Sequence, residues 1–283
     1  MFPKNKILIV GVNSFLGLSL VKLVKDTSVV VGIYNTNSNN LSSDIKNIHI
    51  TEIDNLFDDF DIVYFISSYI PFGNEINHFE LFNVNVDLLS KFLYKFKSAR
   101  FILTSSISVY GNNTLNINEN SFSSNVSAYG LSKLWAEQII SKHHSFAIMR
   151  ISSMYGVGMK KVTFLPLIIH NAIFSNEITL LGDGSRLQNY IHVDDVAVSL
   201  VAAAKTRVNG IFLSVSDCSN TNIEIAQVIK KYLPSIIIKF SDIDESLSST
   251  FDAFCTYNTL NWKNRMNLNS GIEQVIEWLK KEY

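Results

Sequence analysis

The 283-residue chain has little cysteine and no long hydrophobic run. Its only two cysteines, Cys218 and Cys255, cannot build a disulfide framework, so we expect free, buried thiols and a reducing compartment. The longest apolar stretches, such as 196–204, fall well short of the roughly 20 residues that a membrane span needs. The apolar run 6–10 is too short for a signal peptide. These absences predict a soluble cytoplasmic protein without a membrane partner.

The charge balance excludes another class of partner. The formal net charge is −1, and no block of lysines or arginines forms a basic patch, which argues against a nucleic-acid partner. A chain of this length can form one large domain or two lobes around a sizeable core. Length and composition therefore indicate the size of the domain, whereas the function has to be inferred from the motifs.

A short apolar strand leads into a glycine-containing turn near the N-terminus. The run 7–10 is wholly apolar, which is typical of a parallel strand buried on both faces, and an amphipathic helix is expected over 18–25. Glycines in the turn between them let a pyrophosphate approach the backbone, and the helix N-terminus favours its negative charge. An ordinary strand-to-helix turn is the alternative. The predicted cofactor residues of this turn are Gly11, Ser14, Phe15, Leu16 and Gly17.

The end of the second strand, 29–34, is where a dinucleotide enzyme distinguishes its cofactors. An acidic residue there would bind the ribose hydroxyls of NAD and repel a 2′-phosphate. The segment 35–40 contains neither a carboxylate nor an arginine. Neutral amides and hydroxyls can donate to a 2′-phosphate, so Asn35 and Thr36 are predicted cofactor contacts and NADP(H) is favoured over NAD(H). A polar loop that accepts both cofactors is the alternative.

Strands and helices continue to alternate through the first half of the chain. A third strand is predicted over 62–66, a helix over 88–96 and a fourth strand over 101–104. This alternation predicts an α/β fold with a doubly wound parallel sheet of the Rossmann type. Ligands on such sheets bind outside the carboxyl ends of the strands. Ser67 and Ser106, which follow two of these strands, are therefore placed at the cofactor crevice, although serines at strand ends more commonly cap turns.

Tyr129 and Lys133 lie four residues apart in a segment that can form a helix. On a helix their side chains project from the same face, about one turn apart. An ammonium near a tyrosine favours the phenolate and lowers the tyrosine pKa from about 10 toward the pH where enzymes work. The pair therefore suits acid/base catalysis, while a surface contact between the two side chains is the simpler alternative.

Several segments, in order, resemble the extended short-chain dehydrogenases/reductases of the NAD(P)-dependent sugar-nucleotide epimerase/dehydratase family. They are the turn 11–17, the segment 104–111, Tyr129 with Lys133, and the segments 150–156 and 182–195. The resemblance runs from end to end and implies a smaller C-terminal substrate lobe, a nucleotide-diphosphate sugar as substrate and a homodimer. It also implies that Tyr129 is the acid/base, that Lys133 holds the nicotinamide ribose and lowers the tyrosine pKa, and that Ser106 hydrogen-bonds the reacting sugar oxygen.

The chain departs from the family pattern in its first half. Ser14 replaces the middle glycine of the cofactor turn and is expected to alter the contact with the phosphates. Ile107 and Ser108 stand where family dehydratases carry an acidic pair. Because an aliphatic side chain cannot act as a general acid, a 4,6-dehydratase is disfavoured.

The substrate half also departs from the family pattern. Ser153 stands where the family often has an asparagine that contacts the substrate diphosphate, and Gln188 replaces an arginine. Arg186 or Arg265 could supply the missing cation, and the alternative for each is a solvated surface arginine. The predicted substrate contacts are Ser106, Ser153, Arg186 and Gln188.

The second half is predicted to complete the sheet and to build the substrate lobe. Helices and strands are expected over 164–174, 178–181, 196–205, 211–214, 222–232 and 272–280. Asp194 or Asp195 is expected to cap the helix 196–205, and His192 has no Cys/His/Glu cluster beside it, so no metal site is predicted. The dinucleotide-binding domain would comprise 1–156 with about 196–215 returning to it, and the substrate lobe 157–195 and 216–283.

Together these features predict an NAD(P)H-dependent reductase of a nucleotide-linked 4-keto sugar. Hydride transfer would be coupled to protonation of the sugar oxygen by Tyr129. The missing acid after the second strand, the short chain and residues 107–108 favour this reaction. An NAD-dependent nucleotide-sugar 4-epimerase, which needs the same catalytic residues, is the alternative. A non-catalytic dinucleotide-binding sensor, motivated by Ser14 and Gln188, is the alternative from another class.

Overall fold

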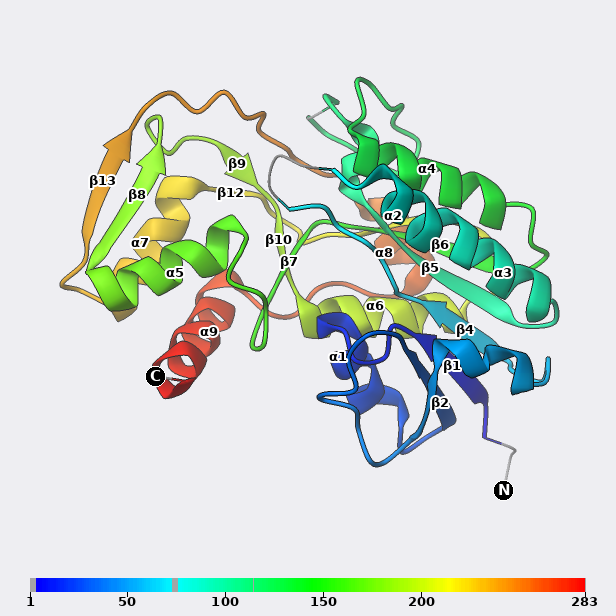
Figure 1. Ribbon diagram of the computed structural model, residues 1–283. Helices are drawn as coiled ribbons and strands as arrows, with labels where there is room; N and C mark the ends of the chain where they lie inside the picture. The colour runs from blue at the N-terminus through cyan, green and yellow to red at the C-terminus, as the bar shows by residue number, and fades with distance from the viewer. Residues whose placement is uncertain (1–3, 73–75, 114, 283) are drawn as a thin grey trace.

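The larger lobe is built around a parallel sheet (Figure 1). The computed structural model describes residues 4–72, 76–113 and 115–282. Seven strands pair in the order β11-β6-β5-β4-β1-β2-β3, and every pair is parallel. Their bounds are β1 Lys6–Val10, β2 Val29–Tyr34, β3 Lys46–His49, β4 Ile62–Phe65, β5 Arg100–Ser106, β6 Phe146–Ile151 and β11 Gly210–Ser214. The predicted doubly wound sheet of the Rossmann type is confirmed.

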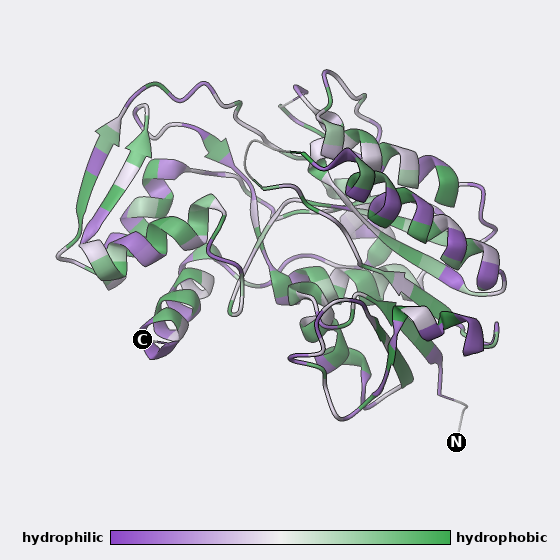
Figure 2. Ribbon diagram, in the orientation of Figure 1, coloured by the Kyte–Doolittle hydropathy of each residue, from purple (hydrophilic) through white to green (hydrophobic). Residues whose placement is uncertain are grey.

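Helices cover both faces of this sheet, which is why its strands other than the edge strand β3 are mostly apolar (Figure 2). One face packs against α1 (Phe15–Val24) and α6 (Val193–Lys205). The other packs against α3 (Leu88–Lys95) and α4 (Ala128–Ile140). Each fully buried leucine, isoleucine or phenylalanine in these layers contributes roughly 1.5–3 kcal/mol. The layers hold the carboxyl ends of the strands, where the predicted site residues lie, in fixed positions.

A second apolar core lies in the smaller lobe. The elements that build it are α5 Phe164–Ser175, β8 Glu177–Leu181, α7 Asn222–Tyr232, β13 Ile237–Ser241 and α9 Leu268–Glu282. Two short pairs lie between the lobes in Figure 1, namely β7 (Ser153–Tyr155) with β10 (Tyr190–His192) and β9 (Leu187–Gln188) with β12 (Asn220–Thr221). The remaining helices of the larger lobe are α2 His78–Phe82 and α8 Phe254–Leu260. The exact division of the chain into the two lobes stays a prediction.

Two strands of the sheet, β3 and β6, were absent from the sequence-based expectation. The predicted third strand is β4, and β3 precedes it at the edge of the sheet. Only Ile48 of β3 is buried, so Lys46–His49 has no apolar run that would signal a strand. The returning strand β11 and the helices α5, α6, α7 and α9 appear where the apolar patterns predict them, with ends shifted by a few residues.

The cap of α6 differs from the expected one. His192, not Asp194 or Asp195, is the N-cap, and its Nδ1 accepts from the amide of Asp194 at 3.3 Å. Asp194 instead accepts from Ser19 Oγ at 2.6 Å, and Asp195 accepts from the amides of Arg265 and Met266. The carboxylates are thus used in contacts with segments that are distant in sequence, so the prediction of an aspartate cap is wrong.

The expectation of buried thiols is also wrong. Cys218 and Cys255 are both free and exposed. Cys218 lies in the loop between β11 and β12, and Cys255 lies in the first turn of α8.

Candidate active site

Only glycine fits at the two ends of the turn between β1 and α1, because a Cβ at either position would collide with backbone atoms. Gly11 has φ +94°, and a Cβ on it would lie 2.9 Å from the amide nitrogen of Ser67. A Cβ on Gly17 would lie 2.5 Å from the carbonyl oxygens of Gly11 and Val12. The absent side chains therefore bring α1 directly against the end of β1, and they bring Ser67 beside the turn.

The N-terminus of α1 is capped by the serine that replaces the middle glycine. Ser14 Oγ accepts from the amide of Gly17 at 3.1 Å, so this side chain is turned back onto its own helix. The amides of Phe15 and Leu16 have no acceptor within the helix and stay available to an anion. The close-packed turn and these amides fit the pyrophosphate of a dinucleotide.

The end of β2 presents neutral groups. Asn35 and Thr36 are exposed, and the carbonyl of Asn35 lies 2.8 Å from His49 Nε2. The rings of Tyr34 and His49 meet edge to face with centroids 5.4 Å apart. The residues 35 and 36 are therefore held at the carboxyl edge of the sheet, where an adenosine ribose would be recognised.

The catalytic candidates meet at the ends of β4, β5 and α4. Ser127 caps α4 through its side chain, which accepts from the amide of Gly130 at 3.2 Å and begins the helix just before Tyr129. The side chains of Ser68 and Ser106 lie beside the Tyr129 hydroxyl, and both lower the pKa of this phenol. Ser106 also donates to Ser108 Oγ at 3.0 Å. The structure thus brings the predicted Ser106 and Tyr129 into direct contact.

Lys133 lies beneath this contact and is almost fully buried. Its Nζ donates to the carbonyl oxygen of Thr104 at 3.0 Å and lies 5.9 Å from the centroid of the Tyr129 ring. Burial lowers the pKa of Lys133 to about 8, against the opposing effect of Glu137. The ammonium is therefore held by the end of β5 on the same side of α4 as the tyrosine.

The expected lowering of the Tyr129 pKa is wrong in this structure. Burial raises the pKa of Tyr129, while the hydrogen bonds from Ser68 and then Ser106 lower it in part. The lysine does not offset the burial, because its ammonium faces the ring and bonds to a backbone oxygen. The proton stays on the phenol until a reacting group or the neighbouring hydroxyls favour its removal.

Two side chains of this site were absent from the predicted set. One is Ser68, and the other is Asn85, which is 1% exposed and lies in the π-helical turn Asn83–Asp87. The Asn85 amide donates to the carbonyl of Tyr69 and to Ser132 Oγ. No sequence pattern marks this turn, although a π-helical turn is often found at functional sites.

A buried ion pair supports the site from behind. Arg150 at the end of β6 binds Glu137 of α4 through two hydrogen bonds, of 2.7 and 3.0 Å. Glu137 also accepts from Ser105 Oγ at 2.6 Å, and the Arg150 guanidinium stacks on Tyr110. Glu137 follows Lys133 by four residues, which is the spacing that could have revealed it as a neighbour on the same helix face.

Apart from Ser106, the predicted substrate residues lie on or directly beside the short strands β7 and β9. Ser153 begins β7 and is exposed, and Gln188 ends β9. Gln188 Nε2 donates to Asn222 Oδ1 at 2.7 Å. Arg186 Nε donates to the carbonyl of Leu247 at 3.3 Å, which leaves its terminal nitrogens for other partners. Where the family has an arginine, this chain therefore has the hydrogen-bonded amide side chains of Gln188 and Asn222.

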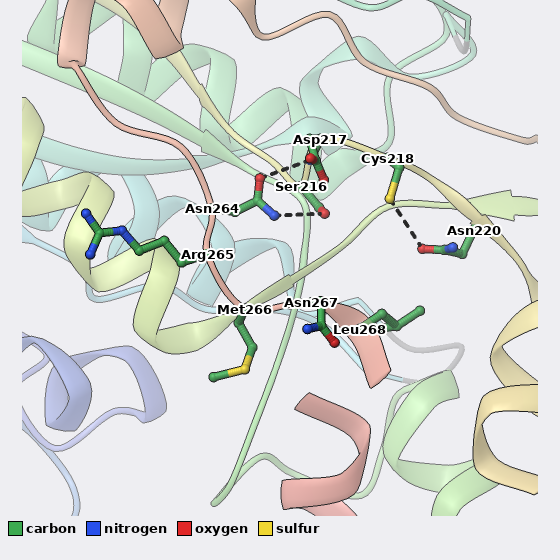
Figure 3. A pocket seen from close by; sticks show the side chains of 9 residues that line it. All are labelled: Ser216, Asp217, Cys218, Asn220, Asn264, Arg265, Met266, Asn267 and Leu268. Carbon is green, nitrogen blue, oxygen red and sulfur yellow. Dashed lines mark hydrogen bonds between the residues drawn. The ribbon is translucent and has the colours of Figure 1, made fainter. Parts of the chain in front are cut away.

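Arg265, the second candidate cation, lines a small cavity of about 170 Å³ between the loops 216–220 and 264–268. In Figure 3 its side chain extends away from Ser216 and Cys218 on the other side of the cavity. None of the other predicted catalytic, cofactor or substrate residues lines this cavity. Arg265 therefore lies at a cavity apart from the other predicted site residues.

Two features are absent from the described residues. Within the three described ranges, no three His, Cys, Asp or Glu side chains gather in a way that could hold a metal ion. No helix in that part of the chain is long and apolar enough to cross a membrane.

A Rossmann-type sheet with a glycine turn, and with a serine, a tyrosine and a lysine at its carboxyl edge, defines the class of dinucleotide-dependent oxidoreductases. A sequence model described as the NAD dependent epimerase/dehydratase family matches residues 7–213, and the chain belongs to this family. It is an enzyme of the extended short-chain dehydrogenase/reductase type, as the motifs predict, and a nicotinamide dinucleotide is its class of cofactor.

Curated relatives are distant in sequence. A dTDP-D-glucose 4,6-dehydratase of Dictyostelium discoideum is 26% identical over 266 residues, which cover 80% of this chain and 61% of the relative. The chain thus spans less than two thirds of that relative's length. A putative UDP-glucose 4-epimerase of Methanocaldococcus jannaschii is 23% identical over 302 residues, which cover 97% of this chain and 98% of the relative.

Solved structures share the whole fold. A UDP-N-acetylglucosamine 4-epimerase from Methanobrevibacter ruminantium superimposes with a TM-score of 0.88 at 19% identity and covers 100% of both chains. A UDP-glucuronic acid 4-epimerase from Bacillus cereus, in complex with UDP-glucuronic acid and NAD, gives a TM-score of 0.87 at 21% identity and covers 98% of this chain and 100% of that chain. At these identities the likeness establishes the two-lobed fold.

Proposed function

We propose that the protein transfers hydride at carbon 4 of a nucleotide-linked sugar and couples this to proton transfer by Tyr129. The observation that carries the proposal is the gathering of Tyr129, Ser106 and the buried Lys133 at the ends of α4 and β5, where Lys133 lies 5.9 Å from the Tyr129 ring and bonds to the carbonyl of Thr104. A phenol with a raised pKa holds its proton at neutral pH and can donate it to a developing alkoxide.

Each residue has a separate part in this proposal. Ser106 orients the reacting sugar oxygen, and Tyr129 gives a proton to that oxygen or takes one from it. Lys133 holds the cofactor ribose by its ammonium. The cofactor phosphates are held by the amides of Phe15 and Leu16, and a bound nicotinamide supplies the hydride transfer itself.

Of the two predicted reactions, the comparisons favour the 4-epimerase. The relative that is matched along almost its entire length is named as a 4-epimerase, as are two of the solved structures with the same fold. The reductase of a 4-keto sugar stays a second candidate, because the end of β2 has no acidic residue that would favour retained NAD. Ile107 and Ser108 still disfavour the dehydratase chemistry of the first relative, since neither is a general acid.

The substrate is proposed to be a nucleotide-diphosphate sugar. Ser153 begins β7, and its amide donates to the carbonyl of Asn189, which follows Gln188 of β9. Arg186 directly precedes β9 and has terminal nitrogens that can bind a phosphate. The preference for NADP(H) is likewise a proposal, supported by the neutral Asn35 and Thr36.

Incubation of the purified protein with pairs of C4-epimeric nucleotide sugars tests the proposal. Interconversion without added cofactor supports the epimerase. Oxidation of NADPH or NADH in the presence of a 4-keto nucleotide sugar, without interconversion of the pairs, selects the reductase. Tyr129→Phe should abolish turnover in either case, and full turnover by this variant would refute the catalytic role. Binding of dinucleotide without any turnover would select the sensor.

A further inference from the structure

The Tyr129 hydroxyl has two serine partners, and the proposed reaction uses only one of them. Ser106 comes from the end of β5, while Ser68 comes from the segment that follows β4. Ser68 Oγ also donates to Asn85 Oδ1 at 3.2 Å. The phenol is therefore connected through Ser68 to a buried side chain that no step of the proposed reaction employs.

Asn85 is fixed in place by backbone partners. Its Oδ1 accepts from the amide of Tyr69 at 2.8 Å, and its Nδ2 donates to the carbonyl of Tyr69 at 3.0 Å. The same Nδ2 donates to Ser132 Oγ at 2.9 Å, and Ser132 in turn donates to the carbonyl of Tyr129. Because all these bonds are made inside the protein, the acceptor that faces Ser68 stays in one position whatever the state of the phenol.

Ser68 has a single proton to share between two neighbours. When Tyr129 is neutral, its hydroxyl can donate to Ser68 Oγ while Ser68 donates to Asn85. When Tyr129 is a phenolate, the stronger bond is the one from Ser68 to the charged oxygen. The Asn85 oxygen then loses Ser68 but keeps the amide of Tyr69, so no buried acceptor is left without a donor.

We propose that Ser68 is a positioning residue for the acid/base, whose hydroxyl proton turns from Asn85 to Tyr129 whenever Tyr129 gives up its own proton. Ser68 thus stabilises the phenolate without contacting the substrate. The inference rests on the proposed function, in that Tyr129 is the group that gives and takes the proton.

The other groups around Tyr129 do not replace this contact. The charged residues of α4 on this side are Lys133, which faces the ring, and Glu137, which is paired with Arg150. The end of β5 contributes the Ser106 hydroxyl, and the π-helical turn contributes the neutral amide of Asn85. The Ser68 hydroxyl is therefore the group that can reorient when the charge on the Tyr129 oxygen changes.

Ser68→Ala tests the inference in the enzyme. We expect kcat to fall about tenfold or more, and the limb of the pH profile that reports Tyr129 to move to higher pH by about one pH unit, because a stabilising bond to the phenolate is lost. The direction is the same for oxidation and reduction, since both limbs follow the pKa of Tyr129. Ser68→Thr keeps a hydroxyl and should restore the profile. Ser141→Ala, which removes an exposed hydroxyl that donates to the carbonyl of Gln138 at the C-terminal end of α4, should change neither quantity.

A titration without cofactor or substrate gives a second measurement. The ultraviolet absorbance of tyrosinate is recorded against pH for the wild type and Ser68→Ala, and the matching Tyr129→Phe variants are subtracted. We expect the midpoint for Tyr129 to be higher in Ser68→Ala. An unchanged midpoint together with an unmoved pH profile would overturn the inference.

The two proposals fail in different ways. If Tyr129→Phe retains full turnover, the proposed function is wrong, while the titration still tells whether Ser68 acts on the phenol. If Tyr129→Phe is inactive and Ser68→Ala keeps the wild-type profile and midpoint, only the role of Ser68 is wrong. A lower kcat in Ser68→Ala without any movement of the profile or midpoint would also contradict that role.

Discussion

Lys133 Nζ lies 5.9 Å from the centroid of the Tyr129 ring and faces the ring. The hydrogen bond of the ammonium goes to the backbone at Thr104, and the phenol oxygen is bonded by serines. Tyr129 and Lys133 are therefore not hydrogen-bonded to each other, and α4 together with the end of β5 holds them side by side. The lysine is charged at neutral pH in a buried site, and this has a cost that can be measured.

Lys133→Met should stabilise the fold while it abolishes turnover. Burial lowers the pKa of Lys133 from 10.5 to about 8, which corresponds to a cost of about 3 kcal/mol, and loss of the bond to Thr104 reduces the net gain to about 1–3 kcal/mol. The folded wild type releases the proton near pH 8 and the unfolded chain only near 10.5, so the wild type gains stability between these values. The advantage of the variant should therefore shrink from about pH 8 upward. Urea unfolding at several pH values measures this, with the exposed Lys91→Met as control.

Glu137→Ala should destabilise the protein strongly. It leaves the Arg150 guanidinium buried without its carboxylate, which costs about 3–5 kcal/mol. Asp87→Ala breaks the exposed pair with Lys91 and should cost less than about 1 kcal/mol. Denaturant unfolding of the two variants compares them directly. Equal losses in both would contradict the supporting role of the buried pair.

Asn35→Asp should shift the cofactor preference toward NAD(H). A carboxylate at the end of β2 repels a 2′-phosphate and accepts from ribose hydroxyls, so the Kd for NADPH, measured by fluorescence titration, should rise about tenfold or more while that for NADH changes little or falls. Asn258→Asp on the exposed side of α8 adds the same charge outside the site and serves as control. Equal effects of Asn35→Asp on both cofactors would show that the segment 35–40 does not distinguish NADP(H) from NAD(H) by the 2′-phosphate.

The homodimer implied by the sequence resemblance has a candidate surface on α2 and α4. Phe79, Phe82, Leu131 and Trp135 are all substantially exposed, and the rings of Phe82 and Trp135 meet edge to face at 5.3 Å. Trp135→Glu should convert a dimer into a monomer, as measured by sedimentation. Phe254→Glu, at an exposed position of α8, should leave the assembly unchanged. A wild-type protein that is monomeric at all concentrations would refute the predicted dimer.

The sequence predicts the sheet well because its strands are buried on both faces. Continuous apolar runs such as Ile62–Phe65 mark strands, and the glycines and serine of the first turn mark the dinucleotide site. The edge strand β3 has one buried residue and leaves no such mark. Local pattern fails at this edge, and β6 is also absent from the predicted strands although its residues 147–151 are buried.

Contacts between distant segments explain the remaining errors. Ser68 and Asn85 reach Tyr129 only through the packing of β4, the π-helical turn and α4. Asp194 looks like a cap in sequence, but Ser19 occupies its carboxylate. The direction of the Tyr129 pKa shift depends on burial and on where the ammonium points, and neither follows from a spacing of four residues.

The two exposed thiols make the chain addressable by covalent labels. The thiolate is the reacting form, and burial together with Asp217 raises the pKa of Cys218. Alkylation should therefore modify Cys255 before Cys218, so that one probe can be placed on α8 and a second on the loop beside β12. Because the carbonyl of Cys218 is held by Asn189, next to the predicted substrate residue Gln188, the slower label would report on the same loop that borders the proposed substrate site.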